Sequence, residues 1–143
     1  TFITQRAIAA SPIMIGGSMI SMDDHSIDLL TNKEMLSCVK NGVHGKLVHS
    51  QDNFELWNAP VENDEEFGFL SYKVNEGWFA VFNRSKEKRT FNLNGSFAKF
   101  LKSGVTYQMY NVWEDEAIGD YQKHHKLSFT IDANGAVFIK YKV

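Results

Sequence analysis

The chain has 143 residues, 43% of them hydrophobic and 13% aromatic, which is enough for one well-packed domain with a short extension but too little for two full domains. A net charge of −2 provides no basic surface for nucleic acid or an anionic membrane. No stretch reaches the roughly 18 apolar residues of a membrane span. The single cysteine, Cys38, excludes an internal disulfide and a cysteine-based metal site, and it leaves the cellular compartment open.

The first elements suggest a chain that begins inside another domain. Residues 1–10 start in the middle of a helical pattern, and Ser11-Pro12 ends it because the residue before proline disfavours helical backbone. Residues Ile13–Ile15 are then predicted to form a short, buried, apolar strand, closed by Gly16-Gly17. The next forty residues contain no comparable strand for parallel pairing, and a lone buried strand leaves its backbone unsatisfied. We therefore expect this chain to be the tail of a larger protein.

Two short helices are predicted next. Ser21 can cap the first, and Asp23 and Asp24 suit the positive end of its dipole. The sequence Thr31–Glu34 fits a capping box for the second helix. Gly42 should end that helix.

From Gly45 the pattern changes from helical to strand and turn, so we divide the chain into residues 1–44 and 45–143. The second part has the size of one β-sandwich. Trp78–Phe82 is apolar on both faces, which predicts a central strand. Eight strands are predicted, at Lys46–His49, Asn53–Asn58, Phe67–Val74, Trp78–Asn83, Arg89–Leu93, Thr106–Trp113, Lys126–Ile131 and Ala136–Val143.

The connections predict how these strands are joined. Asn75–Gly77 favours a tight hairpin between the third and fourth strands, and Asp132–Gly135 favours another between the last two. The polar segments Ala59–Glu66 and Glu114–Lys123 are predicted to be surface connections. The fold class is therefore mainly β, an antiparallel β-sandwich of Greek-key type preceded by a short α/β segment, with a β-barrel as the alternative.

Six segments, in order along the chain, resemble parts of one enzyme family. They are Ala7–Gly17, Leu29–Glu34, Asp52–Trp57, Gly77–Arg84, Tyr110–Trp113 with Ile118-Gly119, and Gly135–Phe138. The first two are similar to the last strand and the final helix of the catalytic barrel in the α-galactosidase (melibiase) family, glycoside hydrolase family 27 and its clan. The others are similar to strands of that family's C-terminal domain.

The resemblance implies a (β/α)8 barrel followed by an antiparallel β-sandwich, so residues 1–44 would be the last barrel elements. It also implies cleavage of a terminal α-linked galactose, or a related sugar, with retention of configuration. In the family, one aspartate attacks the sugar and another acts as acid and base, which requires carboxyl groups roughly 5–5.5 Å apart. Those aspartates lie on the fourth and sixth barrel strands, whereas this chain would begin near the seventh helix. We therefore assign no catalytic residue, no substrate-binding residue, no metal site and no cofactor.

The chain departs from the family at two places. Ser18-Met19-Ile20 stands where the family usually has Asp-Leu-Arg, and Ser37–Gly45 replaces its Ile-Asn-Gln-Asp-Pro-Leu-Gly stretch. These differences are typical of a divergent branch, for which another α-glycoside is an alternative substrate.

Several reactive side chains have simpler structural explanations. Glu114-Asp115-Glu116 is predicted to be a solvated turn, because consecutive carboxylates rarely face each other across a cleft. The pair His124-His125 points to opposite faces of an extended chain and lacks a third ligand with zinc-like spacing. His44 and His49 are predicted surface residues, and Cys38 a buried, inert thiol.

The three tryptophans, Trp57, Trp78 and Trp113, could stack on sugar rings. The alternation around them instead favours a place in the core or at a domain interface.

These observations favour a C-terminal part of a retaining α-galactosidase-like hydrolase, whose sandwich packs on and stabilises the catalytic barrel. The alternatives are a non-catalytic carbohydrate-binding module and a purely structural interaction domain. The expected partners are the barrel of the same protein and an α-galactoside or other carbohydrate, and an extracellular or periplasmic parent is somewhat favoured. Without the barrel, an apolar patch should be exposed and open to self-association, formed by Phe2, Ile3, Ile8, Ile13, Met14 and Ile15.

Overall fold

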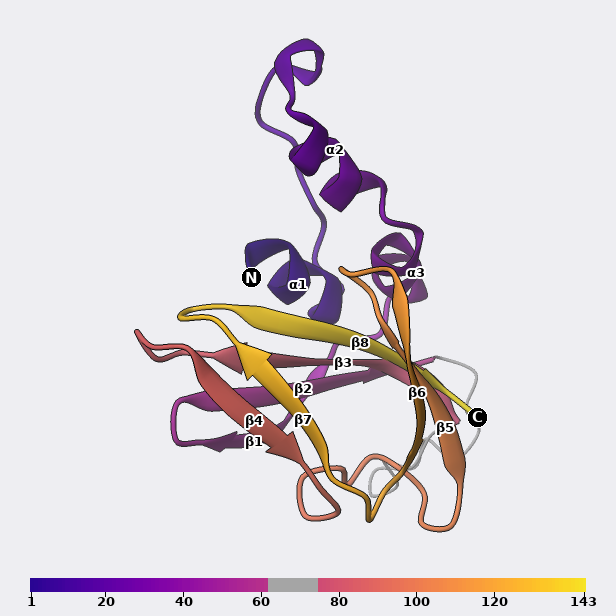
Figure 1. Ribbon diagram of the computed structural model, residues 1–143. Helices are drawn as coiled ribbons and strands as arrows, with labels where there is room; N and C mark the ends of the chain where they lie inside the picture. Colours follow the sequence, from indigo (N-terminus) through magenta and orange to yellow (C-terminus); the bar gives the residue numbers. More distant parts are fainter. Residues whose placement is uncertain (62–74) are drawn as a thin grey trace.

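The structure, a computed structural model, describes residues 1–61 and 75–143 (Figure 1). Its helices are α1 (Phe2–Ile8), the 3-10 turn η1 (Met19–Ser21), α2 (Asp24–Thr31) and α3 (Lys33–Asn41). Its strands are β1 (Lys46–Gln51), β2 (Phe54–Pro60), β3 (Glu76–Asn83), β4 (Arg89–Leu93), β5 (Thr106–Asn111), β6 (Glu116–Gln122), β7 (Leu127–Ile131) and β8 (Ala136–Lys142). The predicted strand Phe67–Val74 lies outside the described residues, as does most of the surface connection Ala59–Glu66. The hairpin at Asn75–Gly77 therefore stays a prediction.

The strands form two antiparallel sheets that pack face to face. The larger sheet has the order β1-β2-β3-β8-β5-β6, and the smaller consists of β4 and β7. The core between them contains Phe79 from the large sheet and Phe91 and Phe129 from the small one. On β7, Phe129 and Ile131 are buried whereas Ser128 and Thr130 are exposed, as the alternation predicts. The prediction of a mainly antiparallel β-sandwich is confirmed.

Strand β3 is buried on both faces, as predicted for a central strand. Phe79 and Val81 face the sandwich core. Trp78, Ala80 and Phe82 belong to a second apolar cluster on the opposite face of the sheet. The helices α1 and α3 cover that face (Figure 1).

The helical layer contacts the sheet closely. Ile8 and Met35 are buried in the second cluster with Phe138 of β8. The chain passes α1 at Gly45, whose backbone N–H donates to the Ile8 carbonyl at 2.7 Å. A Cβ at Gly45 would lie 2.5 Å from that carbonyl oxygen, so this contact requires glycine.

The predicted strand Ile13–Ile15 is absent from the described structure. These residues have neither helical nor strand conformation, and the Met14 side chain is 90% exposed. The prediction of a buried strand was wrong because no neighbouring strand of this chain pairs with the segment, so its backbone stays accessible.

The helix caps differ slightly from the prediction. Asp23, and not Ser21, caps α2 by accepting from the Ser26 backbone N–H at 2.9 Å. Asn32, and not Thr31, caps α3, while the Thr31 hydroxyl donates back to the Ile27 carbonyl. Helix α3 ends as predicted at Gly42, which is left-handed with φ of 72°.

Two predicted connections were wrong. Glu114–Lys123 contains strand β6, which pairs with β5 at the sheet edge. Asp132–Gly135 does turn, with the Gly135 N–H donating to the Asp132 carbonyl. It joins β7 and β8 in different sheets, however, so it is not a hairpin.

Candidate interaction surface

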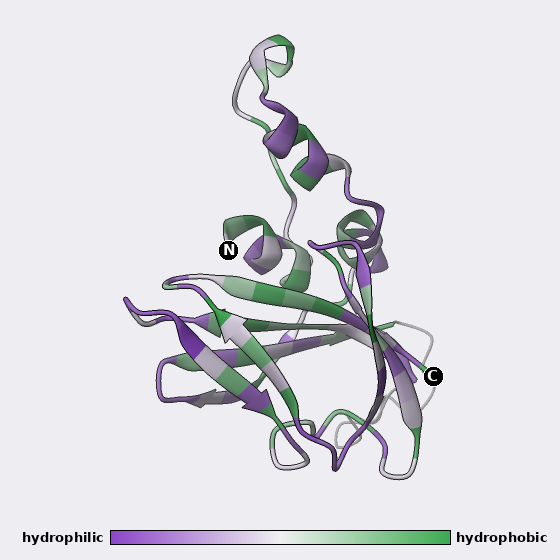
Figure 2. Ribbon diagram, in the orientation of Figure 1, coloured by the Kyte–Doolittle hydropathy of each residue, from purple (hydrophilic) through white to green (hydrophobic). Residues whose placement is uncertain are grey.

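The N-terminal segment exposes most of the large hydrophobic side chains that the described structure leaves on its surface. Seven of the nine exposed large hydrophobics lie between residues 2 and 36, and the other two are Leu47 and Val143. We call these seven the N-terminal apolar surface: Phe2, Met14, Ile15, Met19, Ile20, Ile27 and Leu36. In Figure 2, green segments recur along the part of the chain that projects from the sandwich. Exposed apolar side chains gathered on one segment are typical of an interaction site.

Helix α2 carries part of this apolar surface. It projects beyond α1 and α3, away from the sheets (Figure 1). It carries Ile27, Leu29 and Leu30, yet none of its residues is buried. A short helix in water gains most of its stability from packing an apolar face. The exposed apolar face of α2 therefore suits contact with another protein surface.

The prediction of an exposed apolar patch is confirmed for Phe2, Met14 and Ile15 and was wrong for Ile8. Ile8 is 2% exposed because it packs in the cluster beneath α1 and α3. Ile3 and Ile13 are partly buried against the same cluster. The surface extends instead through η1, where Ile20 is 99% exposed.

Hydrogen bonds fix the helical segment to the sandwich. The Asn32 side chain accepts from the Met35 N–H and donates through Nδ2 to the Val112 carbonyl at 2.8 Å. The indole of Trp113 donates to Thr4 Oγ1 at 2.9 Å. Asn32 thus both caps α3 and connects it to the end of β5.

An ion-pair cluster provides a second connection between helix and sheet. Lys140 of β8 lies 2.9 Å from Glu34 of α3 and 3.4 Å from Glu76 of β3. Its ammonium also lies over the Trp78 ring, 5.5 Å from the centroid. Burial lowers the pKa of Lys140, but the hydrogen bond and charge of Glu34, together with Glu76, outweigh that effect and raise it.

A polar groove of 680 Å³ separates α2 from the turn between β5 and β6. Its α2 wall contains His25, Asp28 and Leu29, and its sheet wall contains Tyr110, Trp113 and Asp115. Thr31, Asn32, Lys33 and Glu34 form the end where α2 meets α3.

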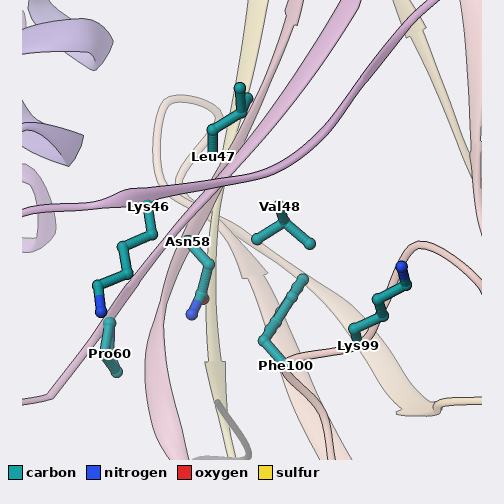
Figure 3. A pocket seen from close by; sticks show the side chains of 7 residues that line it. All are labelled: Lys46, Leu47, Val48, Asn58, Pro60, Lys99 and Phe100. Atoms are coloured by element: carbon teal, nitrogen blue, oxygen red, sulfur yellow. The ribbon is translucent and has the colours of Figure 1, made fainter. Parts of the chain in front are cut away.

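A smaller, mainly apolar cavity of 170 Å³ lies beside the edge strand β1 (Figure 3). Phe100 and Val48 line it, and Lys46 and Lys99 stand at its border. The buried Asn58 also lines it, and its Oδ1 accepts from the Tyr141 hydroxyl at 2.8 Å.

Comparisons with known proteins show that this chain is similar in sequence and fold to part of known glycoside hydrolases. The α-galactosidase of Cyamopsis tetragonoloba is 27% identical over 110 residues, which are 76% of this chain and 24% of that protein. The GH27 β-L-arabinopyranosidase of Geobacillus stearothermophilus superposes with a TM-score of 0.80 at 20% identity, over 99% of this chain and 29% of that one. This chain corresponds to the C-terminal portion of a glycoside hydrolase family 27-like protein.

A second solved structure has the same fold as this chain. The structure of α-galactosidase I from Mortierella vinacea superposes with a TM-score of 0.79 at 12% identity, over 97% of this chain and 34% of that one. The chain thus spans about a quarter to a third of the length of these relatives. No protein-family model matches it.

Two residues of the acidic cluster Glu114-Asp115-Glu116 lie on a solvated turn, as predicted. Glu114 accepts from Asn111 Nδ2 at 2.9 Å, and Asp115 accepts from the Tyr110 hydroxyl. Both carboxylates are exposed, and Glu116 begins β6. The sequence does not indicate that Asp115 lines a groove, because the opposite wall comes from a helix some ninety residues away in the chain.

The histidines show no metal site in the described ranges. No group of three or more histidine, cysteine, aspartate or glutamate side chains comes together there. His44 forms a hydrogen bond with the Ala9 carbonyl at 2.7 Å, and His49 lies against the Phe97 ring. His124 and His125 are exposed on a turn.

Cys38 is a buried thiol, as predicted. Its side chain is 1% exposed, and its Sγ donates to the Ala7 carbonyl at 3.4 Å. Burial, with the nearby charge of Glu34, raises the pKa of the thiol to about 12, so the nucleophilic thiolate is disfavoured.

The tryptophans pack in or against the second apolar cluster, beneath α1 and α3 (the helix-side cluster), as predicted. Trp78 is buried within it, and Trp57 and Trp113 pack on it while partly exposed. Of the three, Trp113 lines the polar groove. In the residues described, no helix has the length and apolar character that a membrane crossing requires.

Proposed function

We propose that this chain is the C-terminal part of a retaining α-galactosidase-like glycoside hydrolase, and that it packs on and stabilises the catalytic barrel. Residues 1–44 would complete the barrel, and residues 45–143 would form the supporting sandwich. The N-terminal apolar surface carries this proposal, because it supplies the contact that a neighbouring domain requires. The parent would cleave a terminal α-linked galactose or a related sugar.

Packing energetics support a stabilising role. Full burial of one large apolar side chain contributes about 1.5–3 kcal/mol. Met14 and Ile20 are almost fully exposed, so both have most of that contribution available on contact with a barrel. Burial of several such side chains, less the ordering cost of the segment, stabilises a domain interface by several kcal/mol.

The described chemistry agrees with a supporting role. Retaining hydrolysis requires two carboxyl groups facing each other about 5–5.5 Å apart, one of them kept protonated. In the described ranges, Glu114 and Asp115 lie on an exposed turn and Glu116 is exposed at the start of β6. Glu34 and Glu76 both pair with Lys140. The chain alone should therefore show no turnover of p-nitrophenyl α-galactoside above the buffer rate.

The decisive test compares the whole parent protein with a version shortened by deletion of residues 45–143. We expect the shortened protein to lose its glycosidase activity at a lower temperature, or to fail to accumulate in soluble form. The proposal is wrong if the reading frame upstream of Thr1 holds no barrel-sized region. Hydrolysis by the 143-residue chain alone would also contradict it.

A further inference from the structure

We propose that the polar groove between α2 and the β5–β6 turn binds a pyranose sugar unit. This goes beyond the packing role proposed above and does not require the barrel. The inference combines the groove's size, its fixed aromatic wall, and its mixture of unpaired hydrogen-bonding groups. At 680 Å³ it falls within the range of pockets that hold small molecules.

The aromatic wall is held in place before any ligand binds. The Trp113 ring is fixed by its hydrogen bond to Thr4 and packs on Phe138, with the ring centroids 5.8 Å apart. Tyr110 is fixed by the bond from its hydroxyl to Asp115. Both rings remain partly exposed. A rigid aromatic surface loses little conformational entropy on binding, and its flat face suits the C–H face of a pyranose.

The opposite wall presents groups with no partner in the described structure. The side chain of Asp28 makes no hydrogen bond or ion pair there, and neither do the side chains of His25 and Lys33. Asp28 offers two acceptor oxygens, Lys33 offers donors, and His25 offers either. Neighbouring sugar hydroxyls both donate and accept, so they match this set.

The charges in the groove favour a neutral polyol over an ion. Asp28 and Asp115 stand on opposite walls and would repel an anion. At the junction of α2 and α3, the positive charges of Lys33 and Lys140 offset the negative charge of Glu34. The junction therefore has no excess of negative charge that would bind a cation. The described part of the chain also lacks a group of three metal-ligating side chains.

The experiment is a titration of the full 143-residue chain followed by amide and indole NMR shifts. The probes are methyl α-D-galactopyranoside and methyl α-D-glucopyranoside, with glycerol as a polyol that has no ring face. We expect saturable shifts at the Trp113 indole and the α2 amides with at least one pyranoside, at a Kd on the order of millimolar. Glycerol should produce no saturation.

Asp28→Asn provides the matched test, because Asp28 is exposed and unpaired in the described structure and its replacement should not affect folding. Loss of a charged hydrogen-bond acceptor should weaken binding about tenfold or more. Asp120→Asn, an equal change on β6 outside the groove, should leave the Kd unchanged. The proposal is overturned if neither pyranoside saturates, if glycerol shifts the same signals equally, or if Asp28→Asn has no effect. None of these results bears on barrel packing, which the deletion experiment tests separately.

Discussion

At the residue scale, one glycine determines how closely the helical segment approaches the sandwich. We expect Gly45→Ala to lower the free energy of unfolding by about 1–3 kcal/mol, because the new methyl group would overlap the Ile8 carbonyl. Urea unfolding followed by tryptophan fluorescence measures the change. Gly17→Ala is the control, since no atom lies within 4 Å of a Cβ at that position. Equal stability of the two variants would show that the contact at Gly45 relaxes without cost.

The Glu34–Lys140 pair makes stability depend on pH in the alkaline range. The pKa of Lys140 is raised above its ordinary value of 10.5 in the folded state, so the folded state binds its proton more tightly. The resulting stabilisation is fully present below pH 10.5 and is lost as the pH rises through the folded pKa. We expect Glu34→Gln to destabilise the chain at pH 8 and to flatten the fall of Tm above pH 10.5. Tm values that fall in parallel for both proteins across this range would contradict this role.

At the element scale, the N-terminal apolar surface should cause self-association of the isolated chain. We expect the double variant Met14→Asp with Ile20→Asp to sediment as a monomer at concentrations where the unsubstituted 143-residue chain forms larger species. Both side chains are almost fully exposed, so the charges should not disturb folding. Val143→Asp changes an exposed apolar residue outside this surface, and this variant should sediment like the unsubstituted chain. An unsubstituted chain that is monomeric at high concentration would contradict the expectation.

Some elements could be predicted from the sequence and others could not, for identifiable reasons. Strand β3 was predictable because apolar residues on both faces indicate a strand covered from two sides. Strand β6 was missed because an edge strand can remain polar, and only Tyr121 among its residues is buried. The segment Ile13–Ile15 has the composition of a buried strand, but a strand also requires a neighbour, which composition does not reveal. The groove was missed because its two walls are far apart in the sequence.

At the scale of the whole molecule, one sheet separates two apolar clusters. The sandwich core and the helix-side cluster share β3 and β8, so alternate residues of one strand serve both. The composition change at Gly45 marks where the secondary structure changes, and the packing continues across it. The resemblance to α-galactosidases that the sequence suggested agrees with the relatives found by comparison. Four of its six segments lie on or beside strands of the sandwich.

Because β3 is covered on both faces, it should be one of the last strands to become exposed when the chain unfolds. Its amide protons should be among the slowest to exchange with solvent, because β3 becomes accessible only after both layers have opened. Cleavage near Gly45 by a protease, followed by dissociation of the helical segment, would uncover Trp78, Ala80 and Phe82 and leave the sandwich with an apolar face exposed to water. Such a nicked product would aggregate more readily than the intact chain.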